Sequence, residues 1–311
     1  MKSRFRPSRD AKLHMLAGPL GKIGRMKTAD LILRLDNEFK ITDCTENLIE
    51  FAVTPDNYQF VNPAFLNGKT GLMIKASETI EKVFTVVFVT DEIIDKVCKE
   101  LNGLIFTHHH FDYYEDERGL QAIRPEQIEK LTNAKHSLYV AHAPLDTHEK
   151  YGTSLALAEI CGIKIEKLFF DYFGAPTALF GRIQRTNFEK FALSVQENLS
   201  RPNLTLHKHK EFVEKIGVVA GGGDMVEILQ EVYDNNCDTL LTGTVEHRWD
   251  LPFVQEGNKK FHELNKKLKI NLVGGTHYGT ERPAMISINK LFKEAGIQSE
   301  FVEDEGLLLA E

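Results

Sequence analysis

Residues 82–110 read KVFTVVFVTDEIIDKVCKELNGLIFTHHH, and this stretch decides the fold class. Its first part, Lys82–Thr90, consists mainly of β-branched and aromatic residues, which predicts a buried strand. A helix is predicted across Asp91–Leu101, with Asp91 near its N-cap. Gly103–Thr107 predicts a second strand, which ends on three consecutive histidines. A strand, a helix and another strand in this order predict parallel strands joined by a crossover helix.

The same alternation continues on both sides of this stretch. Leu31 and Leu35 have the spacing of a short amphipathic helix that starts near Lys27. Further strands are predicted at 137–141, 215–220, 239–242 and 271–274, and further helices at 126–132, 154–161, 188–199, from the glycines at 221–223 to residue 233, and at 281–295. We expect Thr280 to cap the last helix and residues 54–71, rich in Pro, Gly and Asn, to form a loop. The pattern predicts an α/β fold with mostly parallel strands and helices on both faces.

Composition places the chain among ordinary globular proteins. It has 311 residues, of which 42% are hydrophobic and 27% are charged. Since no apolar run approaches the roughly 18 residues of a membrane span, we expect no membrane insertion. The four cysteines lie far apart and form no CxxC pair, which predicts reduced thiols in an intracellular, cytoplasmic setting.

Charge is distributed unevenly along the chain. Residues 1–27 contain eight of the 38 basic residues and one of the 45 acids, which leaves a net charge of −14 on the remainder. An acidic body argues against binding to a phosphate backbone, so nucleic acid is an improbable partner. The basic segment 1–26 has three interpretations: a flexible tail, a mitochondrial targeting segment, or an arm that binds nucleic acid.

Side chains typical of metal ligands follow three of the predicted strands. They lie in the segments THHHFD at 107–112, AHAPLD at 141–146 and GTHYGTE at 275–281. Because ligands collect at the carboxyl ends of strands in open α/β sheets, these loops are expected to face one crevice. A single histidine is more often a hydrogen-bonded or surface residue than a ligand, but three such loops favour a metal site. The five candidate ligands are His108, His109, Asp146, His277 and Glu281.

Such a ligand set suits two divalent ions. Adjacent histidines such as His108 and His109 can diverge to reach different ions, and Glu281 can bridge them through its two oxygens. Mixed imidazole and carboxylate ligation is compatible with Zn, Fe, Mn, Co or Ni. Two ions about 3.5–4 Å apart can activate water and polarise an ester, amide or phosphoryl oxygen.

Other residues near these loops are candidates of second rank. His142 is a candidate catalytic residue, either as a general acid or base or as a support that orients Asp146. His247 is a candidate for substrate contact. We expect His110 and Asp112 to point to solvent rather than to add ligands. The glycines at 221–223 form either a tight turn or an anion-binding turn.

Five short motifs in this order resemble the dinuclear-metal-centre family that is often labelled GTP cyclohydrolase type 2 homologues and is related to the NGG1-interacting factor. They are THH at 107–109, AHxxxD at 141–146, AGGGD at 220–224, TG at 242–243 and THYGTE at 276–281. The resemblance covers about residues 27–304. The chain departs from the family pattern at four places: His110 replaces a proline, the residues at 111–114 replace an apolar stretch, an early tryptophan-aspartate-asparagine motif is missing, and Thr244 replaces an acidic residue.

The resemblance implies a specific organisation. One ion would be held by His109, Asp146 and Glu281, and the other by His108, His277 and Glu281. Two linked α/β lobes would enclose the ions in a cleft, the metal-binding lobe comprising 27–155 with 265–311 and the second lobe 156–264. The family is known for toroidal hexamers, so a homo-oligomer, and specifically a hexamer, is expected.

Two functions are compatible with these residues. The first is a metal-dependent hydrolase that acts on a small-molecule substrate, a nucleotide or other phosphorylated compound, with GTP as the first to test. It is favoured because a ligand set without thiolates leaves exchangeable positions, unlike a closed structural site. The alternative is a non-enzymatic protein that binds metal for storage, delivery or assembly as an adaptor.

Overall fold

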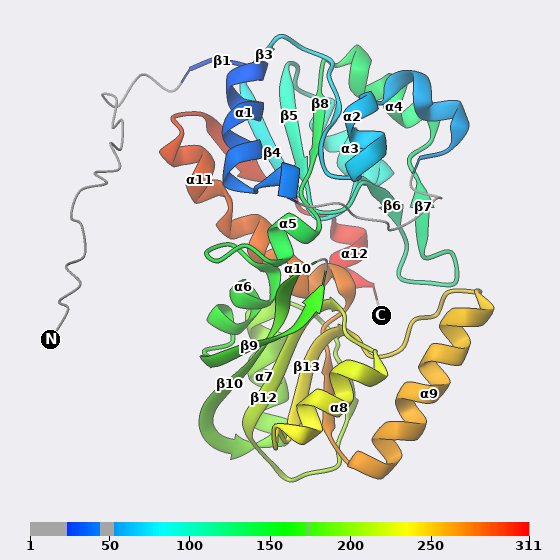
Figure 1. Cartoon of the computed structure of the whole chain (residues 1–311), viewed down its shortest axis with the longest axis vertical. Coiled ribbons are helices and arrows are strands. Elements are labelled where there is room, and N and C mark those ends of the chain that lie inside the picture. The colour runs from blue at the N-terminus through cyan, green and yellow to red at the C-terminus, as the bar shows by residue number, and fades with distance from the viewer. Residues whose placement is uncertain (1–23, 44–52, 173, 311) are drawn as a thin grey trace, which may run out of the picture.

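The computed structural model describes residues 24–43, 53–172 and 174–310. Two mixed sheets dominate it, one of five strands and one of six, stacked end to end along the long axis in Figure 1. Helix α10 (His277–Ser287) lies between the two sheets. The α/β class predicted from the sequence is confirmed, although each sheet also contains antiparallel strands. The basic segment 1–26 falls almost entirely outside the described residues.

The five-stranded sheet has the order β15-β4-β5-β8-β2. Its strands are β2 (Gly71–Ile74), β4 (Lys82–Val86), β5 (Gly103–Thr107), β8 (Ser137–Val140) and β15 (Gln298–Phe301). All neighbours in it are parallel except β2, which pairs with β8 in the antiparallel sense. β4 is shorter than predicted because the chain leaves the sheet after Val86, and Val89 then bonds to Phe111 outside it.

The six-stranded sheet has the order β11-β14-β13-β12-β10-β9. Its strands are β9 (Lys164–Tyr172), β10 (Ala175–Asn187), β11 (Thr205–His207), β12 (Phe212–Gly222), β13 (Thr239–Thr244) and β14 (Asn271–Gly274). The central strands β12, β13 and β14 are parallel, whereas β9, β10 and β11 run antiparallel to their neighbours. Two small antiparallel pairs complete the strands: β1 (Met26–Lys27) with β3 (Thr79–Ile80), and β6 (Phe111–Tyr113) with β7 (Leu120–Ala122).

Helices cover both faces of each sheet. They are α1 (Thr28–Glu38), α2 (Pro63–Gly68), α3 (Asp91–Val97), α4 (Pro125–Asn133), α5 (Ala143–Asp146), α6 (Thr153–Ile160), α7 (Phe188–Leu199), α8 (Val226–Asp234), α9 (Pro252–Leu268), α10, α11 (Asn289–Glu294) and α12 (Glu305–Leu309). Within the described ranges, no helix has the length and apolar character needed to cross a membrane.

Side-chain alternation along the central strands fills four apolar clusters, two for each sheet. On β4, Val83 packs into one cluster and Phe84 into the cluster on the opposite face. On β13, Leu240 and Leu241 divide in the same way between the two faces of the six-stranded sheet. Since burying one such side chain contributes about 1.5–3 kcal/mol, these strands are fixed in register.

Two local predictions are wrong. Residues 54–71 are not a continuous loop, because α2 begins there with Asn62 as its N-cap and Pro63 in its first turn. The last long helix is capped by Thr276, not Thr280: the Thr276 hydroxyl accepts a bond from the Gly279 amide at 3.1 Å.

The expected division into two lobes stays a prediction. One strand, β14, does not lie in the sheet to which the predicted lobe boundary would assign it. β14 was expected with the segment 265–311 of the metal-binding lobe. It instead pairs with β13 and β11 in the six-stranded sheet, so the chain returns to the five-stranded sheet only after Gly274. Helix α10 makes that return.

Candidate metal centre

The candidate ligands meet where the two sheets face each other. His108 and His109 follow β5, and His142 and Asp146 begin and end the turn after β8. His277 and Glu281 lie one turn apart on α10, which follows β14. The three loops therefore converge as expected, but the third comes from the other sheet rather than from the same sheet edge.

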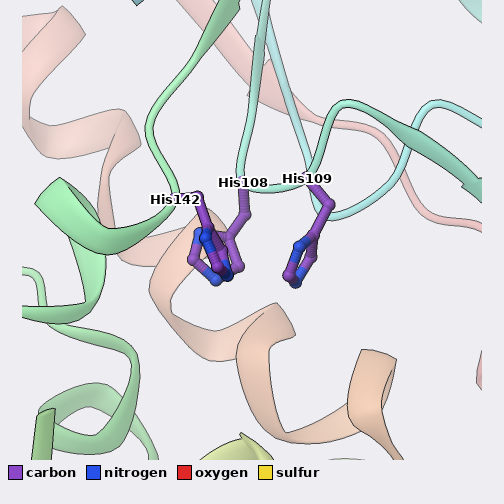
Figure 2. A group of neighbouring side chains, drawn as sticks. All are labelled: His108, His109 and His142. Carbon is purple, nitrogen blue, oxygen red and sulfur yellow. The ribbon is translucent and has the colours of Figure 1, made fainter. Parts of the chain in front are cut away.

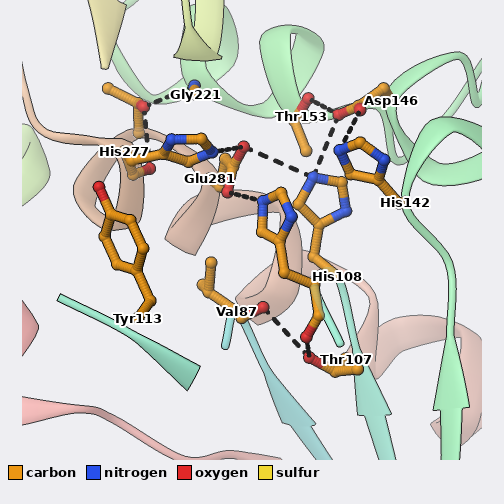
Figure 3. A network of polar contacts seen from close by, with 12 residues as sticks. Val87, Thr107, His108, Tyr113, His142, Asp146, Thr153, Gly221, His277 and Glu281 are labelled. Atoms are coloured by element: carbon orange, nitrogen blue, oxygen red, sulfur yellow. Dashed lines mark hydrogen bonds and ion pairs between the residues drawn. The ribbon is translucent and has the colours of Figure 1, made fainter. Parts of the chain in front are cut away.

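Glu281 is the centre of this arrangement. Its side chain is buried, and its Oε2 lies 2.9 Å from Nε2 of His109. Its Oε1 lies 3.1 Å from Nε2 of His277 and 3.5 Å from Nε2 of His108. The two oxygens of one carboxylate thus face different imidazoles, as Figure 3 shows.

Asp146 extends the cluster on the side of His108. Its Oδ1 lies 3.4 Å from Nε2 of His108 and accepts a hydrogen bond of 2.5 Å from the Thr153 hydroxyl. The contact with His108 differs from the pairing implied by the family resemblance, in which Asp146 joins His109. Sequence reasoning did not identify Thr153, because it lies on α6, beyond the motif that contains Asp146.

A glycine makes room for the bridging carboxylate. Gly221, at the end of β12, has a φ of +72°, and a Cβ built on it would lie 2.3 Å from Oε1 of Glu281. Its amide donates to the Thr280 hydroxyl at 3.0 Å, which ties the strand end to α10. The glycine run at 221–223 therefore has a steric role here, and a side chain at its first position would collide with the cluster.

Burial and charge shift the pKa values in opposite directions. Burial lowers the pKa of His109 well below its usual value, since Glu281 only partly offsets the lost solvation. Burial also lowers the pKa of His108, but Asp146 and Glu281 outweigh it and raise that pKa well above its usual value. Burial raises the pKa of Glu281, yet His277, His109 and His108 together hold it well below its usual range. Glu281 is consequently a buried anion.

The donor atoms fit a divalent metal. His108, His109 and His142 offer ligand atoms within 4.8 Å of one another (Figure 2), and so do His109, His277 and Glu281. Nδ1 of His108 lies 3.0 Å from the carbonyl of Ala141, and its buried Nε2 has no hydrogen-bond partner among the described residues. A histidine that donates from Nδ1 to a carbonyl presents the Nε2 lone pair to a metal.

His142 lies beside the cluster. Its ring centroid is 5.0 Å from that of His108 and 4.8 Å from that of His109, and its Nε2 is 3.9 Å from Oδ2 of Asp146. Its side chain is 15% exposed, more than those of the neighbouring histidines. The position is compatible with both roles expected for it, proton transfer and orientation of Asp146.

The candidates of second rank, His110, Asp112 and His247, differ in how the structure places them. His110 and Asp112 do not point to solvent: both are buried, His110 against aromatic rings and Asp112 in a hydrogen-bonded ion pair with Arg124 of 3.0 Å. The strand β6 that follows the histidines turns them inward. His247 pairs with Asp224, the last residue of the AGGGD motif at 220–224.

Thr153→Val is expected to lower the metal affinity of the predicted centre by about tenfold, because the hydroxyl that orients the Asp146 carboxylate is lost. The matched control is Thr147→Val at the end of α5, whose hydroxyl donates to the carbonyl of Ala143 instead. Competition with a chelator of known affinity measures both. Equal affinities in the two variants would contradict the role assigned to Thr153.

Comparison with known proteins gives a consistent result. A family described as Duf34/NIF3 (NGG1p interacting factor 3) matches residues 64–305. A protein of Archaeoglobus fulgidus named GTP cyclohydrolase 1 type 2 homolog is 25% identical over 83% of this chain and 98% of its own length. One with the same name from Haemophilus influenzae is 23% identical over 74% and 87%.

Solved structures share the fold. The protein ybgI, described as of unknown function, has a TM-score of 0.68 at 17% identity and covers 90% of this chain and 98% of its own. Reduced HcgD from Methanocaldococcus jannaschii has a TM-score of 0.64 at 21% identity, covering 91% and 100%. A Bacillus cereus protein related to NIF3 has a TM-score of 0.63 at 14% identity, covering 92% and 98%. At these identities the likeness concerns the fold alone.

Proposed function

The chain belongs to the Duf34/NIF3 family, and from this membership and the geometry of the cluster we propose that it is a metal-dependent hydrolase. It holds two divalent ions per chain and acts on a nucleotide or another phosphorylated small molecule. One observation carries the proposal: the oxygens of the buried Glu281 face His109 on one side and His277 with His108 on the other. A bridging carboxylate needs this arrangement.

We assign the ligands by motif. The contacts of Glu281 with His108, His109 and His277 support this assignment, whereas Asp146 contacts His108 rather than His109. His108, His277 and Glu281 hold one ion, and His109, Asp146 and Glu281 hold the other. Imidazole and carboxylate donors without a thiolate are compatible with Zn, Fe, Mn, Co or Ni. The ions, when bound, supply Lewis-acid polarisation of the substrate and acidify a water molecule.

The chain's own residues position the reactants. His142 is the most exposed histidine of the cluster, and its ring lies next to those of His108 and His109. We propose that its ring transfers a proton to or from the substrate. Thr153 orients the carboxylate of Asp146, which in turn contacts His108. The side chains around Glu281 are buried, so bulk water is excluded and the local electrostatic interactions are stronger than in solvent.

His142→Asn is expected to retain both ions and to lower hydrolytic turnover by at least about a hundredfold, the usual contribution of general acid–base catalysis. The measurement is hydrolysis of GTP first, because of the relatives' name, and then of a panel of nucleotides and phosphoesters. Protein loaded separately with each candidate metal is assayed. If fully loaded protein hydrolyses no compound with any metal, the hydrolase proposal fails. Transfer of ions to an acceptor within seconds would then favour metal delivery.

We extend the proposal to a homo-oligomer, with a hexamer as the form expected from the family resemblance. Multi-angle light scattering of the full chain measures it directly. A monomer at micromolar concentration would contradict it.

A further inference from the structure

A pocket opens next to the metal cluster, between the hairpin β6–β7 and the residues that follow β13. Two of its lining residues also border the cluster. The ring of Tyr113 lies 5.7 Å from that of His277, and Thr276 directly precedes His277 on the chain. A molecule bound at the cluster can therefore extend into this pocket.

One wall contains an oriented histidine. Nδ1 of His247 lies 2.7 Å from Oδ2 of Asp224, and the two side chains are only 15% and 8% exposed. A ring that donates from Nδ1 to a carboxylate presents Nε2 as a hydrogen-bond acceptor. Asp224 is thus a positioning residue for His247.

Two further acceptor atoms in the pocket are buried without a partner. Thr244 ends β13 and is 8% exposed, and its Oγ1 has no hydrogen bond to any described residue. Glu115 accepts a bond from the Tyr113 hydroxyl at Oε2, while its buried Oε1 has no partner in the same part of the chain. An unpaired buried polar group costs about 1–3 kcal/mol, so both atoms favour a ligand that donates to them.

The charges that line the pocket favour a cation. The pocket is lined by three acidic residues, Glu115, Asp116 and Glu246, and by one Lys or Arg side chain, that of Arg248. Asp116 is already paired with Arg118. An anion would meet the unpaired carboxylate oxygen of Glu115 and be repelled, whereas a cation with N–H groups would satisfy it.

We propose that this pocket is a subsite for a guanidinium or amidinium group. The planar cation donates N–H bonds to Oε1 of Glu115, Oγ1 of Thr244 and Nε2 of His247. The inference rests on the proposed function, because it assigns the basic end of the substrate to the pocket and the reacting end to the metal cluster. Substrates with this group are expected to be preferred over analogues without it.

Trp249 makes the pocket observable. It lines the pocket and is the single tryptophan of the chain. Its ring contacts that of His247 edge to face at 4.6 Å, and a Cβ on Gly119 would lie 2.6 Å from its atoms, so Gly119 covers part of the indole. A ligand beside His247 is therefore expected to change the fluorescence of Trp249.

The test is a fluorescence titration of the full, metal-free chain with methylguanidinium. Tetramethylammonium, a cation without N–H donors, and inorganic phosphate are the comparison ligands. We expect a saturable change with methylguanidinium alone. Thr244→Val and Glu115→Gln are each expected to weaken binding about tenfold or more, as the loss of one hydrogen bond to a charged group predicts.

Thr132→Val is the matched control, since its exposed hydroxyl on α4 bonds to the carbonyl of Glu129. Thermal unfolding verifies that each variant is folded, and Thr244→Ser is expected to retain binding. Saturable binding of phosphate, no response to methylguanidinium, or unchanged affinity in both folded pocket variants overturns the proposal. Because no metal is present, each of these results is independent of whether the loaded protein is a hydrolase.

Discussion

Replacing Glu281 with glutamine is expected to lower the affinity of the cluster for divalent ions by at least about a hundredfold. The substitution keeps the shape of the side chain but removes the one buried anion that lies among three imidazoles. Removing one partner from a buried set of charges costs about 3–5 kcal/mol, which corresponds to roughly two to three and a half powers of ten in affinity. Since both oxygens of Glu281 face ligand histidines, both ions are expected to be affected.

Elemental analysis after dialysis measures this effect directly. Wild type is expected to contain two ions per chain, and Glu281→Gln at most a fraction of that. Glu294→Gln is the matched control, because Glu294 lies on α11 in an exposed pair with Lys150 and away from the cluster. Wild type without metal, or a variant that keeps both ions, would refute the proposed centre.

The strands at the centre of each sheet were predictable because their residues are buried on both faces. β5 and β14 have the predicted bounds, and every residue in them is buried. Such strands are mostly apolar runs in the sequence, which makes their positions visible.

Elements at the edges were less predictable for the opposite reason. β9 is the last strand of the six-stranded sheet, and most of its residues are exposed, so no apolar run marks it. Helix α9 buries only Phe261 and Asn265 among its 17 residues, and its many lysines conceal the helical pattern. Non-local contacts stabilise these elements, and a single sequence does not contain them.

The start of α10 illustrates a different limit. Threonines at 276 and 280 are both plausible caps by residue type. Thr276 is the cap because its hydroxyl accepts from the Gly279 amide, and its backbone, with a φ of +63°, leads into the helix that holds His277 and Glu281 one turn apart. Sequence spacing predicted that these two residues lie together, but the cap that positions them is visible only in the structure.

The candidate metal centre was likewise predictable in part. Motifs predicted the loops that converge, since metal-type side chains after strands are a local signal. The contributions of Gly221, Thr153 and Asp224 were not predictable, because each acts on a residue of another loop. The inward position of His110 depends likewise on the strand β6 that follows it.

His110→Phe is expected to make the protein more resistant to acid. His110 is 4% exposed, its ring contacts those of Phe65 and Phe111, and neither of its nitrogens bonds to any described residue. Burial, together with the nearby His142 and Lys69, lowers its pKa from 6.5 to about 3. Protonation of this ring in the folded protein is therefore strongly disfavoured.

The sign of the effect follows from proton linkage. Between pH 6.5 and about 3 the unfolded chain binds a proton at residue 110 that the folded chain does not bind. Stability is thus lost as the pH falls through this window, by up to about 1.4 kcal/mol per pH unit, and the residue contributes no pH dependence above it. At about pH 4 the wild type is expected to have lost roughly 3 kcal/mol relative to the variant.

Urea unfolding of wild type and variant in the presence of a chelator, at a series of pH values, measures this difference. At neutral pH, His110→Phe is expected to be neutral or stabilising by about 1–2 kcal/mol, because two unpaired buried nitrogens are removed. His136→Phe is the contrasting variant: its Nδ1 accepts from the Gly103 amide at 3.1 Å, and its Nε2 lies 3.0 Å from the carbonyl of Val97. We expect that variant to be destabilised at neutral pH, since its partners lose their hydrogen bonds. Parallel pH profiles of wild type and His110→Phe would show that residue 110 is solvated or paired.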